Sequence, residues 1–187
     1  MKHYLFALLI LSMLVLVGDQ AMSHADSGAN RQGEKAIMTH KNWGNLEQVR
    51  QYKNLYFAGQ PDEAALRHFK ELGGAAVINL REPWETDFDE QAIVEKLGLE
   101  YYNFPVSGRK ELNASTMEKI GNTIEQKGDA PVMVHCASGN RAAAWLATHL
   151  VTVHQDSVDN ALKVAKSVGL TSKVLEGKVV HLLKGKQ

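Results

Sequence analysis

The chain has little of what marks a disulfide-rich, fibrous or nucleic-acid-binding protein. Its 187 residues include one cysteine and four prolines, and 21 basic residues balance 21 acidic ones to a formal charge of zero. One cysteine cannot form an internal disulfide, and a neutral chain without a basic cluster has no electrostatic footprint for nucleic acid or for an anionic membrane surface. We therefore expect no nucleic-acid partner, and any anion must be held by a local site.

The composition is that of an ordinary globular protein, with 44% hydrophobic and 22% charged residues. A chain of this length buries most of the surface that its unfolded form exposes, so it needs neither disulfides nor a structural metal to fold. We expect one globular domain.

The one long hydrophobic run lies at the start of the chain. Lys2 precedes an uncharged apolar stretch over residues 4–17, and the small residues Ser23 and Ala25 follow it. The run is short for a transmembrane helix, and this order is typical of a secretory signal. We predict a signal peptide over residues 1–25 that is cut after Ala25. The mature protein is then periplasmic or secreted, with no stable membrane insertion; a retained membrane anchor is the alternative.

After a predicted flexible leader over residues 26–45, the domain is expected over residues 46–187. Its strands are predicted at residues 53–58, 75–80, 99–104 and 131–135. Its helices are predicted at residues 62–72, 89–97, 115–128, 141–153, 157–168 and 172–184. Asp62 and Asp89 are predicted helix caps, and Ser115 with Glu118 forms a predicted capping box. This alternation indicates an α/β fold with a central, mainly parallel sheet flanked by helices on both faces.

A tight turn at the end of the last predicted strand has the features of an anion site. Cys136 ends the strand, Gly139 lies within the turn, and Arg141 begins the next helix. Successive backbone N–H groups and the helix dipole favour an anion there, and Arg141 adds a full positive charge. The same field favours the thiolate of Cys136, which makes it a candidate nucleophile. The predicted anion-binding residues are Ala137, Ser138, Gly139, Asn140 and Arg141.

Four segments carry a family resemblance. They read Gly59-Gln60-Pro61, Val-Ile-Asn-Leu-Arg at 77–81, Phe-Pro-Val at 104–106, and His-Cys through Arg at 135–141. In this order they resemble the bacterial beta-lactamase-hydrolase-like phosphatases, a branch of the dual-specificity and protein tyrosine phosphatase-like fold, over residues 46–175.

The resemblance implies a cysteine-dependent phosphatase. Cys136 would be the nucleophile that forms a phosphocysteine, and Arg141 with the amides of its loop would cradle the phosphate. The substrate would be a phosphorylated small molecule or a phosphoprotein, such as a phosphotyrosine-type or aryl phosphate. Neither a metal nor an organic cofactor is implied.

The sequence departs from the usual phosphatase pattern in three places. Four residues separate Cys136 from Arg141 where five are usual, and Ala142 stands where phosphatases commonly place Ser or Thr. The segment after Phe-Pro-Val, where these enzymes often supply an acid, contains no Asp. The short loop is similar to that of rhodaneses, so a sulfurtransferase using a Cys136 persulfide is the alternative function. A weakly catalytic anion-binding module is the third.

A phosphate ester with a poor leaving group needs a proton donor. Asp87, in the charged loop after the predicted strand at 75–80, is our predicted general acid, and Glu85 and Glu111 are its rivals. We expect no metal site, because His149 and His154 are five residues apart and would diverge on a helix.

Overall fold

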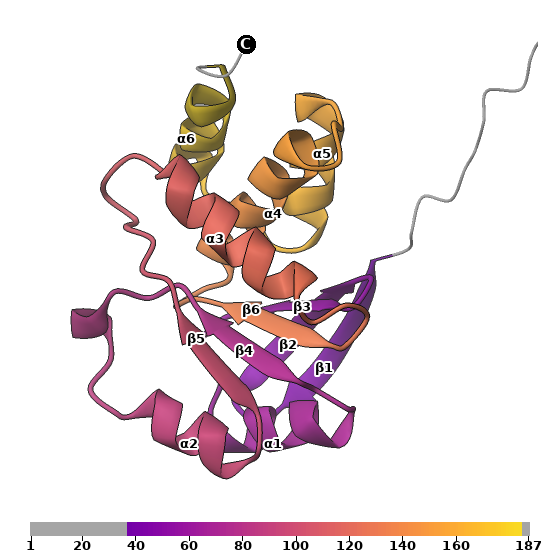
Figure 1. The fold of residues 1–187 in the computed structure, drawn as a ribbon, viewed down its shortest axis with the longest axis vertical. Helices are drawn as coiled ribbons and strands as arrows, with labels where there is room; N and C mark the ends of the chain where they lie inside the picture. The colour runs from indigo at the N-terminus through magenta and orange to yellow at the C-terminus, as the bar shows by residue number, and fades with distance from the viewer. Residues whose placement is uncertain (1–36, 185–187) are drawn as a thin grey trace, which may run out of the picture. The chain divides into compact units, whose positions relative to one another are not determined.

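A computed structural model describes residues 37–184, which contain a six-stranded sheet in the order β1-β2-β3-β6-β4-β5 (Figure 1). The strands are β1 (Met38–Trp43), β2 (Leu46–Tyr52), β3 (Leu55–Ala58), β4 (Ala76–Asn79), β5 (Glu100–Asn103) and β6 (Val132–His135). Strand β2 is antiparallel to both of its neighbours, β1 and β3, whereas β3, β6, β4 and β5 run parallel. The predicted fold class, a mainly parallel sheet flanked by helices, is confirmed.

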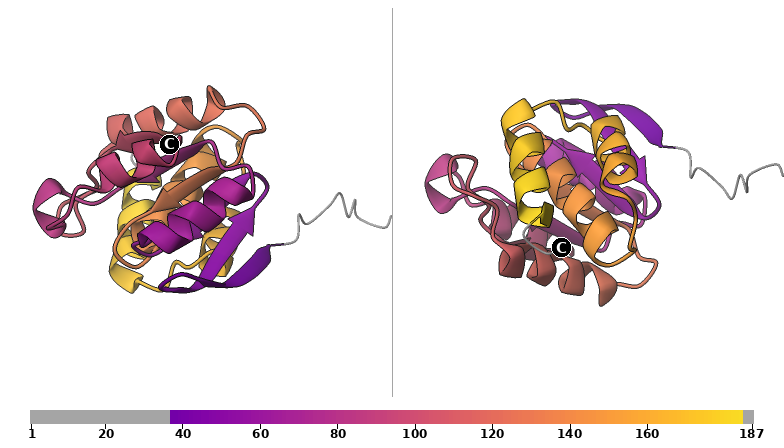
Figure 2. Two further views of the ribbon diagram at one scale, coloured as in Figure 1. Left: turned by 90° about the horizontal axis from the view of Figure 1, so that it is seen from below. Right: turned by 90° about the horizontal axis from the view of Figure 1, so that it is seen from above.

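The helices lie in two layers. They are α1 (Glu63–Glu71), the short 3-10 helix η1 (Pro83–Glu85), α2 (Glu90–Lys96), α3 (Ala114–Glu125), α4 (Asn140–Thr152), α5 (Val158–Ser167) and α6 (Lys173–Lys184). Helices α1 and α2 cover one face of the sheet, and α3 to α6 cover the other (Figures 1 and 2). Each face therefore buries its own apolar core.

The alternation of side chains along β6 assigns its residues to the two cores. Val132 and Val134 belong to the cluster beneath α3 to α6, whereas Met133 belongs to the cluster beneath α1 and α2. Cys136 continues the first series, and the alternation turns His135 to the second face. Cys136 and the neighbouring His135 therefore belong to opposite faces of the sheet.

Local capping follows the sequence in two of three places. The side chains of Asp62 and Asp89 accept hydrogen bonds from backbone amides of α1 and α2, as predicted. The predicted capping box of Ser115 and Glu118 is wrong, because Asn113 caps α3 by accepting from Thr116 N at 3.0 Å. Asn caps as well as Ser, and its position starts the helix earlier than Ser115 could.

The edge hairpin β1–β2 corrects the predicted domain boundary. Residues 38–45, assigned to a flexible leader, form β1 and a two-residue turn at Gly44-Asn45. Their mostly polar character belongs to a sheet edge, where Trp43 at 3% exposure is the buried anchor. A Gly-Asn pair between short runs is itself a hairpin signal that could have found it. The rest of the leader and the predicted signal peptide lie outside the described residues.

Among residues 37–184, no helix is long and apolar enough to span a membrane.

Candidate active site

The turn predicted to bind an anion joins β6 to α4, and residues 136–141 are called the cysteine loop below. Gly139 is the N-cap of α4 and has a left-handed backbone with φ of 83°. A Cβ atom at this position would lie 3.3 Å from the carbonyl oxygen of Ala58. Only glycine therefore fits both the torsion and the close approach of β3.

Cys136 is buried at the base of this loop, with 1% of its surface exposed. Its Sγ accepts a hydrogen bond from the backbone N of Gly139 at 3.1 Å. The first turn of α4 has amides without intrahelical partners, and the helix dipole adds positive potential at this end. The loop thus places the sulfur of Cys136, the candidate nucleophile, among groups that favour negative charge.

The segment that directly follows β3 packs against the cysteine loop. Gln60 N donates to the carbonyl oxygen of Ala137 at 3.3 Å, and Gly59 forms an isolated β-bridge with Ser138. A Cβ atom on Gly59 would lie 3.1 Å from the Ala137 oxygen, a tight contact. The Gly-Gln-Pro segment therefore holds the cysteine loop through backbone contacts.

Arg141 is held by four acceptors. Nη1 and Nη2 donate to the two carboxylate oxygens of Glu85 at 2.7 and 2.8 Å. Nη1 also donates to the carbonyl oxygens of Val106 at 3.0 Å and Leu80 at 3.3 Å. Burial disfavours the charge of Arg141, but the hydrogen bonds and charges of Glu85 and Cys136 together outweigh burial and raise the pKa of the guanidinium. The charge predicted for the anion site is therefore held in place from three segments.

Glu85 is a poor proton donor in this arrangement. Its hydrogen bonds with Arg141 lower the pKa of the carboxyl group below its usual 4.5. The carboxylate is thus ionised near neutral pH and serves as the partner of Arg141, a role that the sequence did not indicate. This pairing argues against Glu85 as the general acid.

The other two acid candidates, Asp87 and Glu111, are both exposed. Asp87 is exposed in the segment between η1 and α2. Glu111 is exposed and lines a separate cavity beside Val106 and Met117. Asp87 as the general acid stays a prediction.

Asn140 braces the loop with its side chain. Its Oδ1 accepts from the backbone N of Thr171 at 2.8 Å and of Ser172 at 2.7 Å, just before α6. The Asn140 amide also donates to Ser138 Oγ at 3.4 Å. Of the predicted anion-binding side chains, that of Asn140 is thus committed to tying the loop to α6.

A cavity of about 580 Å³ opens above Arg141. Its walls include Ser138, Lys110 and Trp84, and 76% of the Trp84 surface is exposed. The opening is large enough for an organic group attached to an anion that reaches Arg141.

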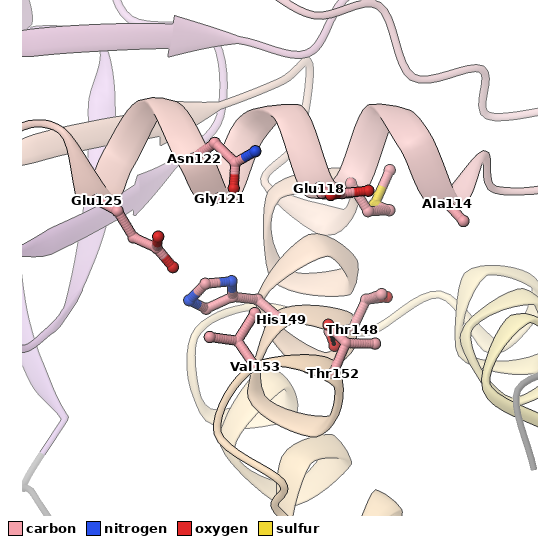
Figure 3. A pocket seen from close by; sticks show the side chains of 10 residues that line it. Ala114, Glu118, Gly121, Asn122, Glu125, Thr148, His149, Thr152 and Val153 are labelled. Atoms are coloured by element: carbon pink, nitrogen blue, oxygen red, sulfur yellow. Dashed lines mark hydrogen bonds between the residues drawn. The ribbon is translucent and has the colours of Figure 1, made fainter.

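A second cavity, of about 320 Å³, lies between α3 and α4 (Figure 3). His149 points from α4 towards α3, stacks on Trp145 and meets His154 edge-on with ring centroids 5.2 Å apart. The predicted divergence of the two histidines is wrong, because α4 ends at Thr152, between them. No group of three or more metal-ligating side chains occurs within residues 37–184.

No family model matches the chain, and no curated protein sequence does. Solved structures are similar. A DUF442 protein from Shewanella putrefaciens CN-32 is 22% identical with a TM-score of 0.59, covering 75% of this chain and 87% of that one. Tk-PTP in its active form is 21% identical with a TM-score of 0.62, covering 71% and 92%. TpbA from P. aeruginosa is 16% identical with a TM-score of 0.59, covering 73% and 83%.

The chain has the fold of the cysteine-dependent protein phosphatases. At these identities the likeness concerns the fold. In this phosphatase-like fold, the cysteine loop occupies the carboxyl end of β6, beside the carboxyl ends of β3 and β4, which is where open α/β sheets bind ligands.

Proposed function

We propose that this protein is a cysteine-dependent phosphatase of the protein tyrosine phosphatase-like class that hydrolyses phosphate monoesters. The observation that carries the proposal is the cysteine loop itself, with Cys136 Sγ at its base, the amide of Gly139 at the N-cap of α4 donating to that sulfur, and Arg141 fixed at its end. The phosphatase-like fold supports it, and TpbA has been solved in complex with pTyr.

The reaction runs in two steps. Cys136 Sγ attacks phosphorus, and an S–P bond forms while the P–O ester bond breaks with its electron pair going to the leaving oxygen. That oxygen takes a proton from a donor, for which we propose Asp87. Water then attacks the phosphocysteine and gives a proton to the donor that was deprotonated in the first step. The S–P bond breaks with its electron pair returning to Cys136 Sγ, and inorganic phosphate leaves. Arg141 and the loop amides stabilise the charge on the phosphoryl oxygens in both steps.

The proposed substrate is an aryl phosphate or a phosphotyrosine-type ester on a phosphoprotein. The exposed indole of Trp84 at the cavity wall offers a surface for an aromatic leaving group, and Arg109 and Lys110 line the same opening. The narrower assignment to the beta-lactamase-hydrolase-like phosphatases rests on the four sequence segments alone.

The short loop favours one second candidate. Four residues between Cys136 and Arg141 make a small ring, and a persulfide needs less room than a phosphoryl group. A rhodanese-like transfer would move the outer sulfur of thiosulfate to Cys136 Sγ with release of sulfite, and cyanide would then take that sulfur as thiocyanate.

One assay pair separates the two functions. Purified wild type and Cys136→Ser are each given nitrophenyl phosphate, and separately thiosulfate with cyanide. We expect hydrolysis of the phosphate ester by the wild type and none by the variant. Thiocyanate production with no ester hydrolysis, together with one added sulfur on Cys136 by intact mass, would replace the phosphatase proposal.

We also propose that the protein is exported. Sequencing the amino terminus of the protein from its native host tests this, and we expect a start at Asp26 in a soluble periplasmic or secreted fraction. An intact start in a membrane fraction would mean that the apolar run is an anchor.

A further inference from the structure

A buried carboxylate lies beneath the cysteine loop, on the opposite face of the sheet from Cys136. Glu90, in the first turn of α2, is 3% exposed. Its Oε1 accepts from Gln60 Nε2 at 2.6 Å, and its Oε2 accepts from Asn79 Nδ2 at 2.6 Å. Tyr101 Oη donates to Oε2 at 3.3 Å, and Nε2 of the fully buried His135 lies 3.2 Å from Oε1. A carboxylate with this many donors is built into the fold.

Three of the four partners of Glu90 come from segments that carry the family resemblance, and the fourth, Tyr101, lies in β5. Gln60 follows β3, Asn79 ends β4, and His135 ends β6. These strands are neighbours in the sheet, with Ala58 and Asn79 both in register with His135. Glu90 therefore joins the ends of the three strands that border the cysteine loop.

The charge of Glu90 determines how the Gln60 amide is oriented. Burial would raise the pKa of Glu90, but the neighbouring His135, Gln60 and Tyr101 outweigh burial and lower it, so the carboxylate is ionised. An ionised carboxylate only accepts hydrogen bonds, so the NH₂ group of Gln60 must face it. The amide oxygen of Gln60 is then left to face Arg81.

From Gln60 the contacts continue to Arg141. Gln60 Oε1 accepts from Arg81 Nη1 at 2.6 Å, and Arg81 Nη2 donates to the backbone oxygen of Glu85. Glu85 in turn holds both terminal nitrogens of Arg141. Gln60 also supports the loop through its backbone bond to Ala137. The Glu90 carboxylate can only accept and the Arg81 guanidinium can only donate, so the Gln60 amide has one allowed orientation between them. If Gln60 turns because Glu90 is changed, its NH₂ group faces Arg81, which is also a donor.

We propose that Glu90 is a positioning residue that aligns Arg141 and the cysteine loop for anion binding through Gln60, Arg81 and Glu85. The inference rests on the proposed function only in that the loop binds a tetrahedral oxyanion. Glu90 does not touch the substrate.

The first test replaces Glu90 with its neutral isostere and measures binding of tungstate by calorimetry. In Glu90→Gln only one accepting oxygen remains. We expect it to stay with Asn79, whose amide is fixed because its Oδ1 accepts from Arg81 N. The new NH₂ group then faces Gln60, so the Gln60 amide turns and its own NH₂ group faces Arg81. We expect tungstate affinity to fall about tenfold, the size of one misaligned charge-assisted contact. The matched control is Glu63→Gln, which removes an exposed carboxylate from the same position of α1, directly after its aspartate cap. The control should bind as the wild type does.

The second test restores the donor–acceptor match by exchanging the two side chains. In the double variant Gln60→Glu with Glu90→Gln, the new carboxylate accepts from Arg81 and from the new amide. We expect this exchange to recover most of the lost affinity, whereas Gln60→Glu alone places two carboxylates in contact and binds worst. A residue that serves only to fill space would show no such recovery.

Three results would overturn the proposal. One is wild-type tungstate affinity in Glu90→Gln, and another is an exchange variant no better than the single variants. The third result applies if Glu90→Gln does not fold. Gln60→Met then replaces it as the test variant, because it interrupts the same contacts at a half-buried position. Wild-type tungstate affinity in Gln60→Met would overturn the proposal. If the wild type itself binds no tungstate, the anion site of the proposed function falls and this inference falls with it. Binding that is indifferent to Glu90 removes the inference alone.

Discussion

Each end of α4 carries a basic side chain, buried for Arg141 and half-buried for His149, and the pKa values of the two side chains move in opposite directions. At the amino-terminal end, burial acts against the charge of Arg141, but Glu85 and Cys136 together outweigh burial and raise the pKa of Arg141. At the other end, burial lowers the pKa of His149 to about 4, and the positive groups of His154 and Lys53 act in the same direction.

The difference between these two ends lies in the partners that each side chain meets. Arg141 has a carboxylate at 2.7 Å, whereas His149 stacks on the Trp145 ring. Desolvation penalises both charges, so the sign of the result depends on whether an opposite charge lies within contact distance. One end of the helix thus keeps a charged guanidinium, and the other holds a neutral imidazole beside a cavity.

The largest effect is expected from replacing Cys136, the proposed nucleophile at the amino-terminal end of α4. Cys136→Ser should lower kcat for nitrophenyl phosphate by on the order of 10⁴-fold or more, because a hydroxyl is not ionised at working pH. Tungstate should still bind, because the charge of Arg141 and the loop amides remain. Wild-type turnover in this variant would exclude a covalent step at Cys136.

The proton donor has the next largest expected effect. Asp87→Asn should slow an alkyl phosphate by about 10²- to 10⁴-fold while slowing nitrophenyl phosphate far less, since that leaving group hardly needs a proton. Steady-state rates on the two esters measure the difference. Equal losses on both esters would mean that Asp87 is not the donor, and Glu111→Gln would then be tested in the same way.

Replacing Glu85 removes the opposite charge that distinguishes the amino-terminal end of α4 from the other end. Glu85→Gln leaves Arg141 without its opposite charge, and we expect the free energy of unfolding to fall by about 1–2 kcal/mol, less than for a fully buried pair because Glu85 is partly exposed. Urea denaturation measures this change.

The pH dependence of that loss has a definite sign. The lowered pKa of Glu85 means that the pair stabilises the folded state above the usual value of 4.5 and that this contribution is lost as pH falls through the lowered folded value. In Glu85→Gln, the free energy of unfolding should no longer include this pH-dependent contribution of the pair. A variant as stable as the wild type at neutral pH would show that Leu80 and Val106 suffice to hold Arg141.

Replacing His149 tests the other end and has the smallest expected effect. Because the pKa of His149 is lowered in the folded state, the unfolded chain binds the extra proton between about pH 6.5 and pH 4. Stability should therefore decrease as pH falls through this window. His149→Phe keeps the aromatic stack and should remove about 1 kcal/mol of that decrease, allowing for solvent screening. Parallel unfolding curves at pH 7 and pH 5 measure it. An unchanged dependence of stability on pH in the variant would contradict a neutral His149 imidazole in the folded state.

The sequence was most informative where structure depends on neighbours along the chain. Asp62 and Asp89 cap their helices because the accepting amide is three residues away, and the cysteine loop follows β6 directly. The hairpin β1–β2 was missed because its exposed edge has no clear apolar alternation, although its Gly44-Asn45 turn was a usable signal.

Within the candidate site, the sequence determined the parts that lie on one short segment: Cys136, Gly139 and Arg141. Only the tertiary structure decided which carboxylate neutralises Arg141 and which carboxylate, Glu90, is buried beneath the loop. Both choices join residues that are distant in sequence, and a charge is stabilised only by groups within a few ångströms of it. Sequence patterns show which charges are present, whereas the packing of β3, β4 and β6 against α2 and α4 sets the distances between them.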